Sequence, residues 1–203
     1  IEIAGAGFLN FYLKREVFEE NIRTILSEKE KLGENDLFSG KKIIIEFTDP
    51  NPFKEFHIGH MMTNAIGESL ARVLEFAGAE VKRANYYGDV GLHVAKAVWH
   101  FLKRGGKDFE SLAKGEDYVQ GNIAYDEDPR AKEEIDAVNK KIYERSDEKI
   151  NRAYDAGKEK SLTAFEDIYK TLGTKFDFYF SESEVEGKGR KVVEEGLERG
   201  IFE

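Results

Sequence analysis

The residues best suited to chemistry are two histidines three positions apart, in the run His57-Ile58-Gly59-His60. An apolar β-branched run precedes them and a helical pattern follows, so they are predicted to open a helix just beyond a strand. Open parallel sheets bind ligands there, beyond the carboxyl ends of their strands. A helix N-terminus offers free N–H groups and a partial positive charge. The pattern predicts phosphate binding, with both imidazoles donating to charge that develops in a transition state.

The histidine pair has two alternative explanations: a chance occurrence of the pattern and a metal site. A His-x-Gly-His run arises by chance in roughly one chain in a hundred of this length. Histidines at i and i+3 can bind zinc, with His93 and His100 as conceivable partners. The chain has no cysteine, and its carboxylates show no ligand spacing, so no metal site is predicted.

Glu46 is the second candidate, because it is an acid inside the apolar run Ile43–Phe47. A buried carboxylate needs a partner. Glu46 is predicted to pair with a Lys or Arg of the chain, to lie at a polar end of the sheet, or to accept a cationic ligand at the end of the strand.

Three loop residues could complete such a site. Lys54 offers a point charge for a carboxylate or a phosphate, although a solvated loop lysine is the commoner case. Asn51 could line the site or only bond its own turn. Asp89 lies in the short loop Gly88–Gly91 after the second predicted strand. It is a candidate second wall of the same cleft, or a plain turn aspartate.

The elements that position these residues indicate an α/β fold. Continuous β-branched residues over 43–47 predict a central parallel strand covered on both faces, and a second strand is predicted over about 80–87. A helix between them carries its apolar residues on one stripe, as a helix that packs on a core does: Ile58, Met62, Ile66, Leu70, Val73 and Ala77. A further helix reaches about Leu102. This is strand–helix–strand–helix, the unit of a parallel sheet.

The remaining segments are predicted to be mainly helical, apart from a strand over 176–180. Helices are expected over 15–31, after the cap Asp128-Pro129, over about 162–172 and near 192–197.

Charge is distributed unevenly along the chain. Residues 1–105 hold 14 Lys+Arg and 15 Asp+Glu, whereas residues 106–203 hold 17 and 25. The total of −9 excludes a generally basic nucleic-acid-binding protein, but it permits a local basic patch.

Composition restricts the class further. The chain is 40% apolar and 12% aromatic, enough to bury a sizeable core. No apolar run approaches the roughly 18–20 residues of a membrane span, and no signal peptide opens the sequence. A cytoplasmic protein without a membrane partner is expected.

The stretch from Glu46 to His60 resembles the HIGH region of arginyl-tRNA synthetases, which are class I aminoacyl-tRNA synthetases. Its particular mark is the order acid–x–x–x–Pro-Asn–x–x–Lys before the histidines. The stretch from Asn64 to Gly91 continues the likeness. Residues 160–203 are similar, more loosely, to the connective insertion of this family, and Ile3 to Phe11 to the end of its N-terminal additional domain.

The resemblance implies a HUP-type, Rossmann-like parallel sheet of the class I synthetases, of which the chain holds the first half. It implies three regions. Residues 1–40 would end the N-terminal additional domain and add a linker helix. Residues 41–105 would be the first half of the nucleotide-binding catalytic domain, and residues 106–203 an acidic, mainly helical connective insertion. The second ATP signature, similar to Lys-Met-Ser-Lys-Ser, does not occur in the 203 residues. A fragment that is inactive by itself is therefore expected.

The family joins arginine to tRNA(Arg) through an arginyl-adenylate made from ATP, with Mg²⁺. The resemblance implies that His57 and His60 are catalytic, that Gly59 also contacts ATP, and that Asp89 belongs to the adenosine side. The arginine pocket would be lined by Glu46, Asp49, Asn51, Lys54 and His60. A monomer is expected. Two other functions stay open: another nucleotidyltransferase of the His-x-Gly-His superfamily, and a non-catalytic synthetase paralogue that binds RNA or protein.

Overall fold

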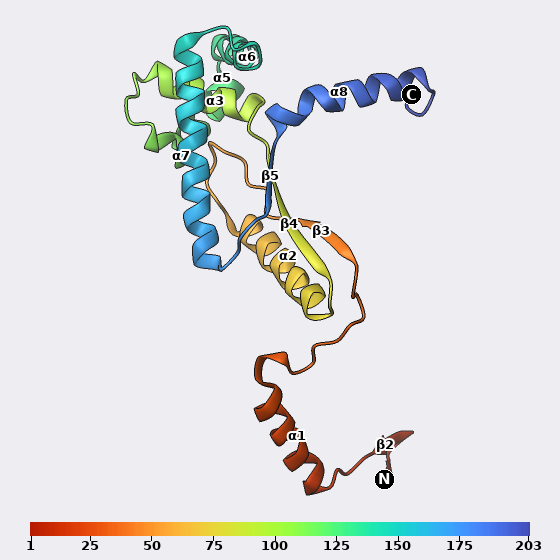
Figure 1. Cartoon of the computed structure of the whole chain (residues 1–203). Coiled ribbons are helices and arrows are strands. Elements are labelled where there is room, and N and C mark those ends of the chain that lie inside the picture. Colours follow the sequence, from red (N-terminus) through yellow and green to blue (C-terminus); the bar gives the residue numbers. More distant parts are fainter.

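A small parallel sheet lies at the centre of the chain in the computed structural model, which describes residues 1–203 (Figure 1). Strands β3 (Lys42–Glu46) and β4 (Glu80–Tyr87) pair in parallel, with Glu46 opposite Ala84. Strand β5 (Phe178–Ser181) joins the other side of β4, with Phe178 opposite Ala84. The order β3-β4-β5 makes β4 the central strand. The predicted α/β fold with a parallel sheet is confirmed, and β4 has the predicted bounds.

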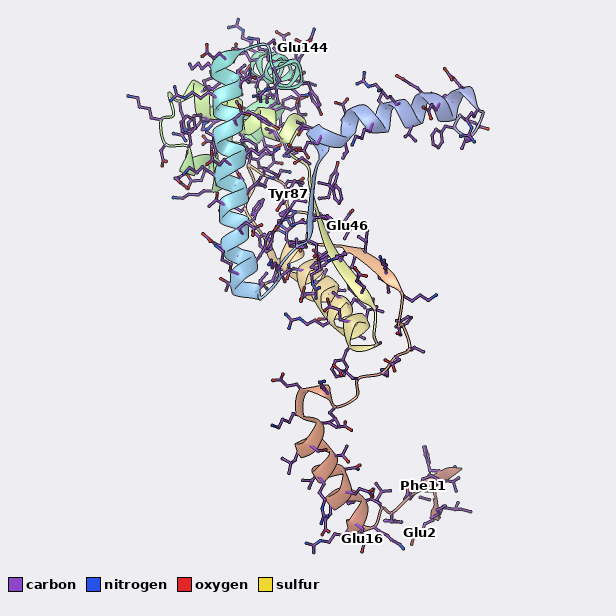
Figure 2. The ribbon with its side chains drawn as sticks, viewed as in Figure 1. Glu2, Phe11, Glu16, Glu46, Tyr87 and Glu144 are labelled. Carbon is purple, nitrogen blue, oxygen red and sulfur yellow. The ribbon has the colours of Figure 1, made fainter.

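Within residues 1–203, strand β3 lies at the edge of the sheet, so the prediction that it is central and covered on both faces is not confirmed for this chain. Its residues alternate between exposed and half-buried, and Ile44 keeps 68% of its surface exposed. Ile43 and Ile45 pack on a small cluster that includes Ala71. Glu46 is exposed at the end of the strand (Figure 2). A buried carboxylate would need a partner, but the side chain of Glu46 is not buried and so does not need one.

Helix α2 (Ile58–Phe76) packs through small and polar residues and not through its apolar stripe. The buried residues are Asn64, Gly67 and Ala71, one turn or two apart. The predicted stripe is mostly exposed, with Ile58 at 73%. A Cβ added to Gly67 would overlap the side chain of Phe47. The close approach of backbone to ring, which only glycine allows, selects the face that the helix buries.

The helices that follow β4 form a second layer with its own core. They are α3 (Leu92–Lys103), α4 (Glu110–Ala113), α5 (Glu116–Glu127), α6 (Pro129–Glu144) and α7 (Glu148–Leu172). Fifteen buried residues make up the core, from Phe53 and Val94 to Ile135 and Tyr154. These core residues come from both sides of residue 105, so one core spans the boundary that was expected there. The division into three regions over 1–40, 41–105 and 106–203 stays a prediction. Helix α7 runs from this layer back to the start of β5 (Figure 1).

Both ends of the chain extend away from these layers (Figure 1). The antiparallel strands β1 (Glu2–Ala4) and β2 (Phe8–Asn10) precede α1 (Arg15–Glu28) and the 3₁₀ turn η1 (Lys29–Lys31). Helix α1 buries none of its residues, and side chains such as Phe11 point into open space (Figure 2). Helix α8 (Glu182–Glu198) buries only Gly196. None of the helices is long and apolar enough to cross a membrane.

A buried carboxylate, that of Asp89, joins the sheet to the helices. It accepts hydrogen bonds from Tyr154 Oη at 3.0 Å and Lys158 Nζ at 2.6 Å, both on α7. It also accepts bonds from the backbone N–H of Ser183 at 2.9 Å and from its hydroxyl at 2.6 Å. Burial raises the pKa of Asp89, but the bonds from Lys158 and Ser183 outweigh it and hold that pKa below its ordinary value. One charge thus fixes the end of β4 against α7 and the first turn of α8.

The contact between Gly67 and Phe47 predicts that Gly67→Ala destabilises the fold. Overpacking typically costs about 1–3 kcal/mol, more than the roughly 1 kcal/mol that alanine gains over glycine inside a helix. Urea unfolding measures the difference. Gly187→Ala in α8 is the matched control, because a Cβ there meets nothing within 4 Å, and it should lose no stability. A Gly67→Ala protein as stable as the native one would contradict the close packing.

Asp89→Asn keeps the shape of the side chain but leaves Lys158, which is only 22% exposed, without its partner. A loss of about 3–5 kcal/mol in the free energy of unfolding is expected, and Asp89→Asn/Lys158→Met should recover part of it. Because the folded-state pKa is depressed, the carboxylate stabilises the fold above its ordinary pKa of about 4, and this contribution is lost as the pH falls below that value.

Urea unfolding at about pH 6 and about pH 3 checks this dependence. Native stability should fall more over this interval than the stability of Asp89→Asn. Identical pH profiles for the two proteins would show that Asp89 does not anchor the helices.

Candidate active site

The histidine pair closes the N-terminus of α2 with its own side chains. The backbone N–H of Gly59 donates to His57 Nδ1 at 3.1 Å, and the backbone N–H of His57 donates to His60 Nδ1 at 3.3 Å. The two rings stack with their centroids 3.7 Å apart. This reciprocal arrangement is a capping box, which satisfies N–H groups that have no partner within the helix. The prediction that His57 and His60 open a helix beyond a strand is confirmed.

The caps also decide which ring nitrogen carries the proton. A Nδ1 atom that accepts a hydrogen bond holds no proton, so the proton of each neutral ring lies on Nε2. Burial, together with the charges of His57 and Lys54, lowers the pKa of His60. The lowered pKa favours the neutral form of the His60 ring. Both Nε2–H groups are left as donors at the helix N-terminus, where an anion is also favoured by the helix dipole.

The loop between β3 and α2 has a strained backbone. Thr48, Asp49 and Phe53 have positive φ angles of 84°, 46° and 67°, a region that residues with a side chain rarely adopt. Phe53 is completely buried, and its N–H donates to Ser161 Oγ on α7 at 3.0 Å. Strain of this kind persists only where the surrounding structure enforces it, and it gathers at functional sites.

Two buried amides enforce the strain, and sequence reasoning missed both. Asn64 donates to Thr48 Oγ1 at 2.9 Å and accepts from Thr174 Oγ1 at 2.9 Å, which ties α2 to the loop and to the end of α7. Asn85 Oδ1 accepts the N–H of Asp49 at 3.1 Å. The only signal in the sequence was an amide inside an otherwise apolar helix or strand pattern, where a buried polar group must find partners.

Asp49 and Asn51 lie at the C-terminal end of β4. Asp49 Oδ1 accepts the N–H of Tyr86 at 2.9 Å. Burial raises the pKa of Asp49, and the Tyr86 N–H partly opposes this. A Cβ on Gly88 would overlap Asn51 Oδ1, so the amide lies directly on this glycine. His93 Nε2 lies 2.8 Å from the carbonyl oxygen of Gly88, which brings a third imidazole to this end of the sheet.

Lys54 forms a wall of the site beside the histidines. Its Nζ lies 4.4 Å from the ring centroid of Tyr118, and a cavity of about 310 Å³ is lined by both Lys54 and His57. After burial, the charge of Lys54 is a further cause of the lowered pKa values of His60 and His93. The lysine is therefore within electrostatic reach of both rings.

Two of the expected site residues form no hydrogen bond with this group. Glu46 is exposed at the end of β3, and Asp89 uses its oxygen atoms on α7 and α8. The zinc partners that were conceivable do not converge: His93 lies on Gly88, and His100 Nδ1 lies 2.7 Å from Asp117. No group of three or more His, Cys, Asp or Glu side chains has the arrangement of a metal site.

Comparisons with known proteins identify relatives of this chain. Residues 21–198 match the family model for tRNA synthetases class I (R), catalytic domain. The arginine–tRNA ligase of Borrelia hermsii is 33% identical over 206 residues, which are 98% of this chain and 35% of that protein. The arginyl-tRNA synthetase of Thermus thermophilus shares the fold with a TM-score of 0.57 and 22% identity, over 80% of this chain and 27% of that one.

A putative arginyl-tRNA synthetase from Campylobacter jejuni has a TM-score of 0.59 and 19% identity, over 92% of this chain and 40% of that one. The chain thus spans about a third of the length of the curated relatives that it matches. The family match includes β3, the strained loop, the histidines of α2 and the helical layer. Sequence and fold therefore lead to one conclusion: the chain belongs to the class I tRNA synthetases for arginine, within their catalytic domain.

Proposed function

We propose that the full-length protein activates L-arginine with ATP and transfers it to tRNA(Arg), and that this chain supplies the histidine half of the active site. The observation that carries the proposal is the pair of Nε2–H donors on His57 and His60, set at a helix N-terminus beyond the C-terminal ends of parallel strands. Family membership supports the reaction class.

In the proposed reaction, a carboxylate oxygen of arginine forms a bond to the α-phosphorus of ATP, and the bond from that phosphorus to pyrophosphate breaks. The negative charge that grows on the departing pyrophosphate would be stabilised by His57, His60 and the helix dipole. Gly59 leaves room for the His57 ring, because a Cβ there would lie 2.9 Å from its Cε1 atom. The ring could then point its Nε2–H outward.

The arginine side of the proposed site consists of Asp49, Asn51, Lys54 and His60, with Glu46 at the rim. Lys54 would take the amino-acid carboxylate or the α-phosphate as a point charge. Glu46 would accept the guanidinium, whose planar fork of N–H groups matches a carboxylate. Asp89 would serve the adenosine side by holding the loop Gly88–Gly91, since its own oxygens bond α7 and α8.

The remaining conditions belong to the same proposal. ATP would arrive with Mg²⁺, which binds mainly through phosphate oxygens, water and one or two carboxylates. No residue of this chain is assigned to the ion. The protein would act as a monomer in the cytoplasm.

His57→Asn tests the donor role apart from the capping role. Asparagine is a good helix cap, but it lacks the outward Nε2–H group. The melting temperature should stay close to the native one. The rate of arginyl-adenylate formation in the full-length protein should fall about 10²–10³-fold, as when one oxyanion donor is removed. His57→Ala should lose the cap as well, which costs about 1 kcal/mol of stability. Rapid-quench single turnovers measure the rate, and a native rate in His57→Asn would exclude the donor role.

Glu46→Gln tests the rim of the arginine pocket. Because Glu46 is exposed, its charge can be removed without a change in stability. The KM for arginine should rise about tenfold, an effect between that of an exposed ion pair and that of a desolvated one. The KM for ATP should stay unchanged. Glu80→Gln, an exposed carboxylate at the start of β4, is the matched control. An unchanged arginine KM in Glu46→Gln would remove Glu46 from the pocket.

A further inference from the structure

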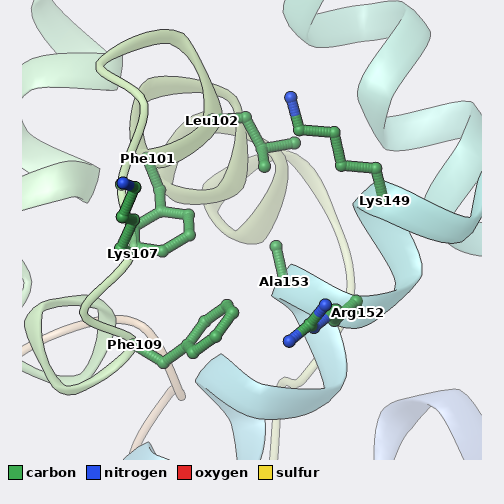
Figure 3. Close-up of a pocket in the computed structure, with 8 residues that line it drawn as sticks. Phe101, Leu102, Lys107, Phe109, Lys149, Arg152 and Ala153 are labelled. Carbon is green, nitrogen blue, oxygen red and sulfur yellow. The ribbon is translucent and has the colours of Figure 1, made fainter.

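A second cavity, of about 270 Å³, lies between the end of α3, the loop after it and the first turns of α7 (Figure 3). Its floor is apolar. Phe101 and Ala153 are each only 1% exposed, and Leu102 and Phe109 are half-buried. The rings of Phe101 and Phe109 lie 5.2 Å apart, at an angle of 32°. Phe101 closes the back of the floor, where Arg104 lies over its ring, and the apolar surface left partly exposed belongs to Leu102 and Phe109.

Three cations surround this floor: Lys107, Lys149 and Arg152. Lys107 comes from the loop, and the other two come from the start of α7 (Figure 3). All three are exposed, and none forms an ion pair, whereas the neighbouring Lys103 and Arg104 each bind a carboxylate. The cations of the cavity are therefore free to bind an anion.

The three cations lie in the acidic half of the chain. Residues 106–203 hold 17 Lys+Arg and 25 Asp+Glu, so carboxylates are plentiful in this half of the chain. Three cations without ion pairs at one cavity attract anions to that place.

The combination of charge and ring surface indicates the kind of ligand. Unstacked bases pack on aromatic side chains and on arginine planes, and arginine can grip a phosphate with two N–H groups. An acidic peptide would use the cations but would leave the apolar floor uncovered. A nucleotide within a strand uses both.

We propose that this cavity seats one unpaired nucleotide of an RNA strand, with the base on the exposed surface of Phe109 and Leu102 and the flanking phosphates on Lys107, Lys149 and Arg152. Only the identification of that strand as tRNA rests on the proposed function. None of these residues belongs to the candidate active site, so the cavity would bind RNA at a second place.

The test uses the 203-residue chain and a fluorescein-labelled, unstructured RNA of about twelve nucleotides, a length within the range of known single-strand sites. Fluorescence anisotropy gives Kd at several salt concentrations. The variant Lys107→Ala/Lys149→Ala/Arg152→Ala should bind at least tenfold more weakly. The slope of log Kd against log salt should fall by about two, because each phosphate contact on a single strand contributes about 0.7. Circular dichroism should show a native fold.

Matched controls make the test decisive. Lys175→Ala/Lys188→Ala/Lys191→Ala removes the same charge from exposed cations without ion pairs, after α7 and on α8, and should keep the native affinity. An equal loss in this control would show general attraction and overturn the proposal. An abasic strand of the same length should bind at least fivefold more weakly, as expected when base stacking is lost. Equal binding of that strand, or displacement of RNA by polyglutamate of equal charge, would also overturn it.

A second measurement separates this proposal from the proposed function. In the full-length protein, the three-residue cavity variant should raise the KM for tRNA(Arg) and leave the KM values for arginine and ATP unchanged. A full-length protein that forms no arginyl-tRNA would end the proposed function, while the RNA affinity of the 203-residue chain would still decide on the cavity.

Discussion

The carboxylate of Asp89 is the fixed point on which the arrangement of this chain depends. It is completely buried, which is tolerable only because Lys158, Tyr154 and Ser183 supply both charge and hydrogen bonds. Through these bonds the end of β4 is fixed to two helices that are distant in sequence. The loop after β4 is held at the same time, and with it Gly88, on which Asn51 lies. The position of the candidate site therefore depends on the protein groups that stabilise the buried charge of Asp89.

A second constraint acts on the other side of the site, where the chain turns from β3 into α2. Positive φ angles at Thr48, Asp49 and Phe53 would relax in an isolated loop. Here the bonds of Asn64 and Asn85 hold the turn in place. A turn fixed in this way presents polar groups in one geometry before any ligand arrives. Such preorganisation is what electrostatic stabilisation of a transition state requires.

Features that depend on local sequence were predictable. The bounds of β4, the cap at Asp128 and the opening of α2 at His57 follow from propensity, capping and turn chemistry, and the structure confirms them. The buried face of α2 was not predictable, because it is selected by the contact of Gly67 with a ring from another element. The edge position of β3 likewise depends on which strands pair, a non-local choice that a β-branched run does not encode. Asp89 was recognised as polar and well placed, but its partners lie 65 to 94 positions away.

The parallel pairing of β5 with β4 has a consequence for the order in which the chain folds. Arg83 and Asp177, which meet beside these strands, are 94 positions apart, and closing a loop of that length costs conformational entropy before any contact repays it. The helices between them meet mostly near neighbours in sequence, so they can assemble early. Their assembly shortens the effective loop and delivers Phe178 to the edge of β4. We therefore expect the third strand to dock late, and until it docks the edge of β4 stays open to pairing with other chains.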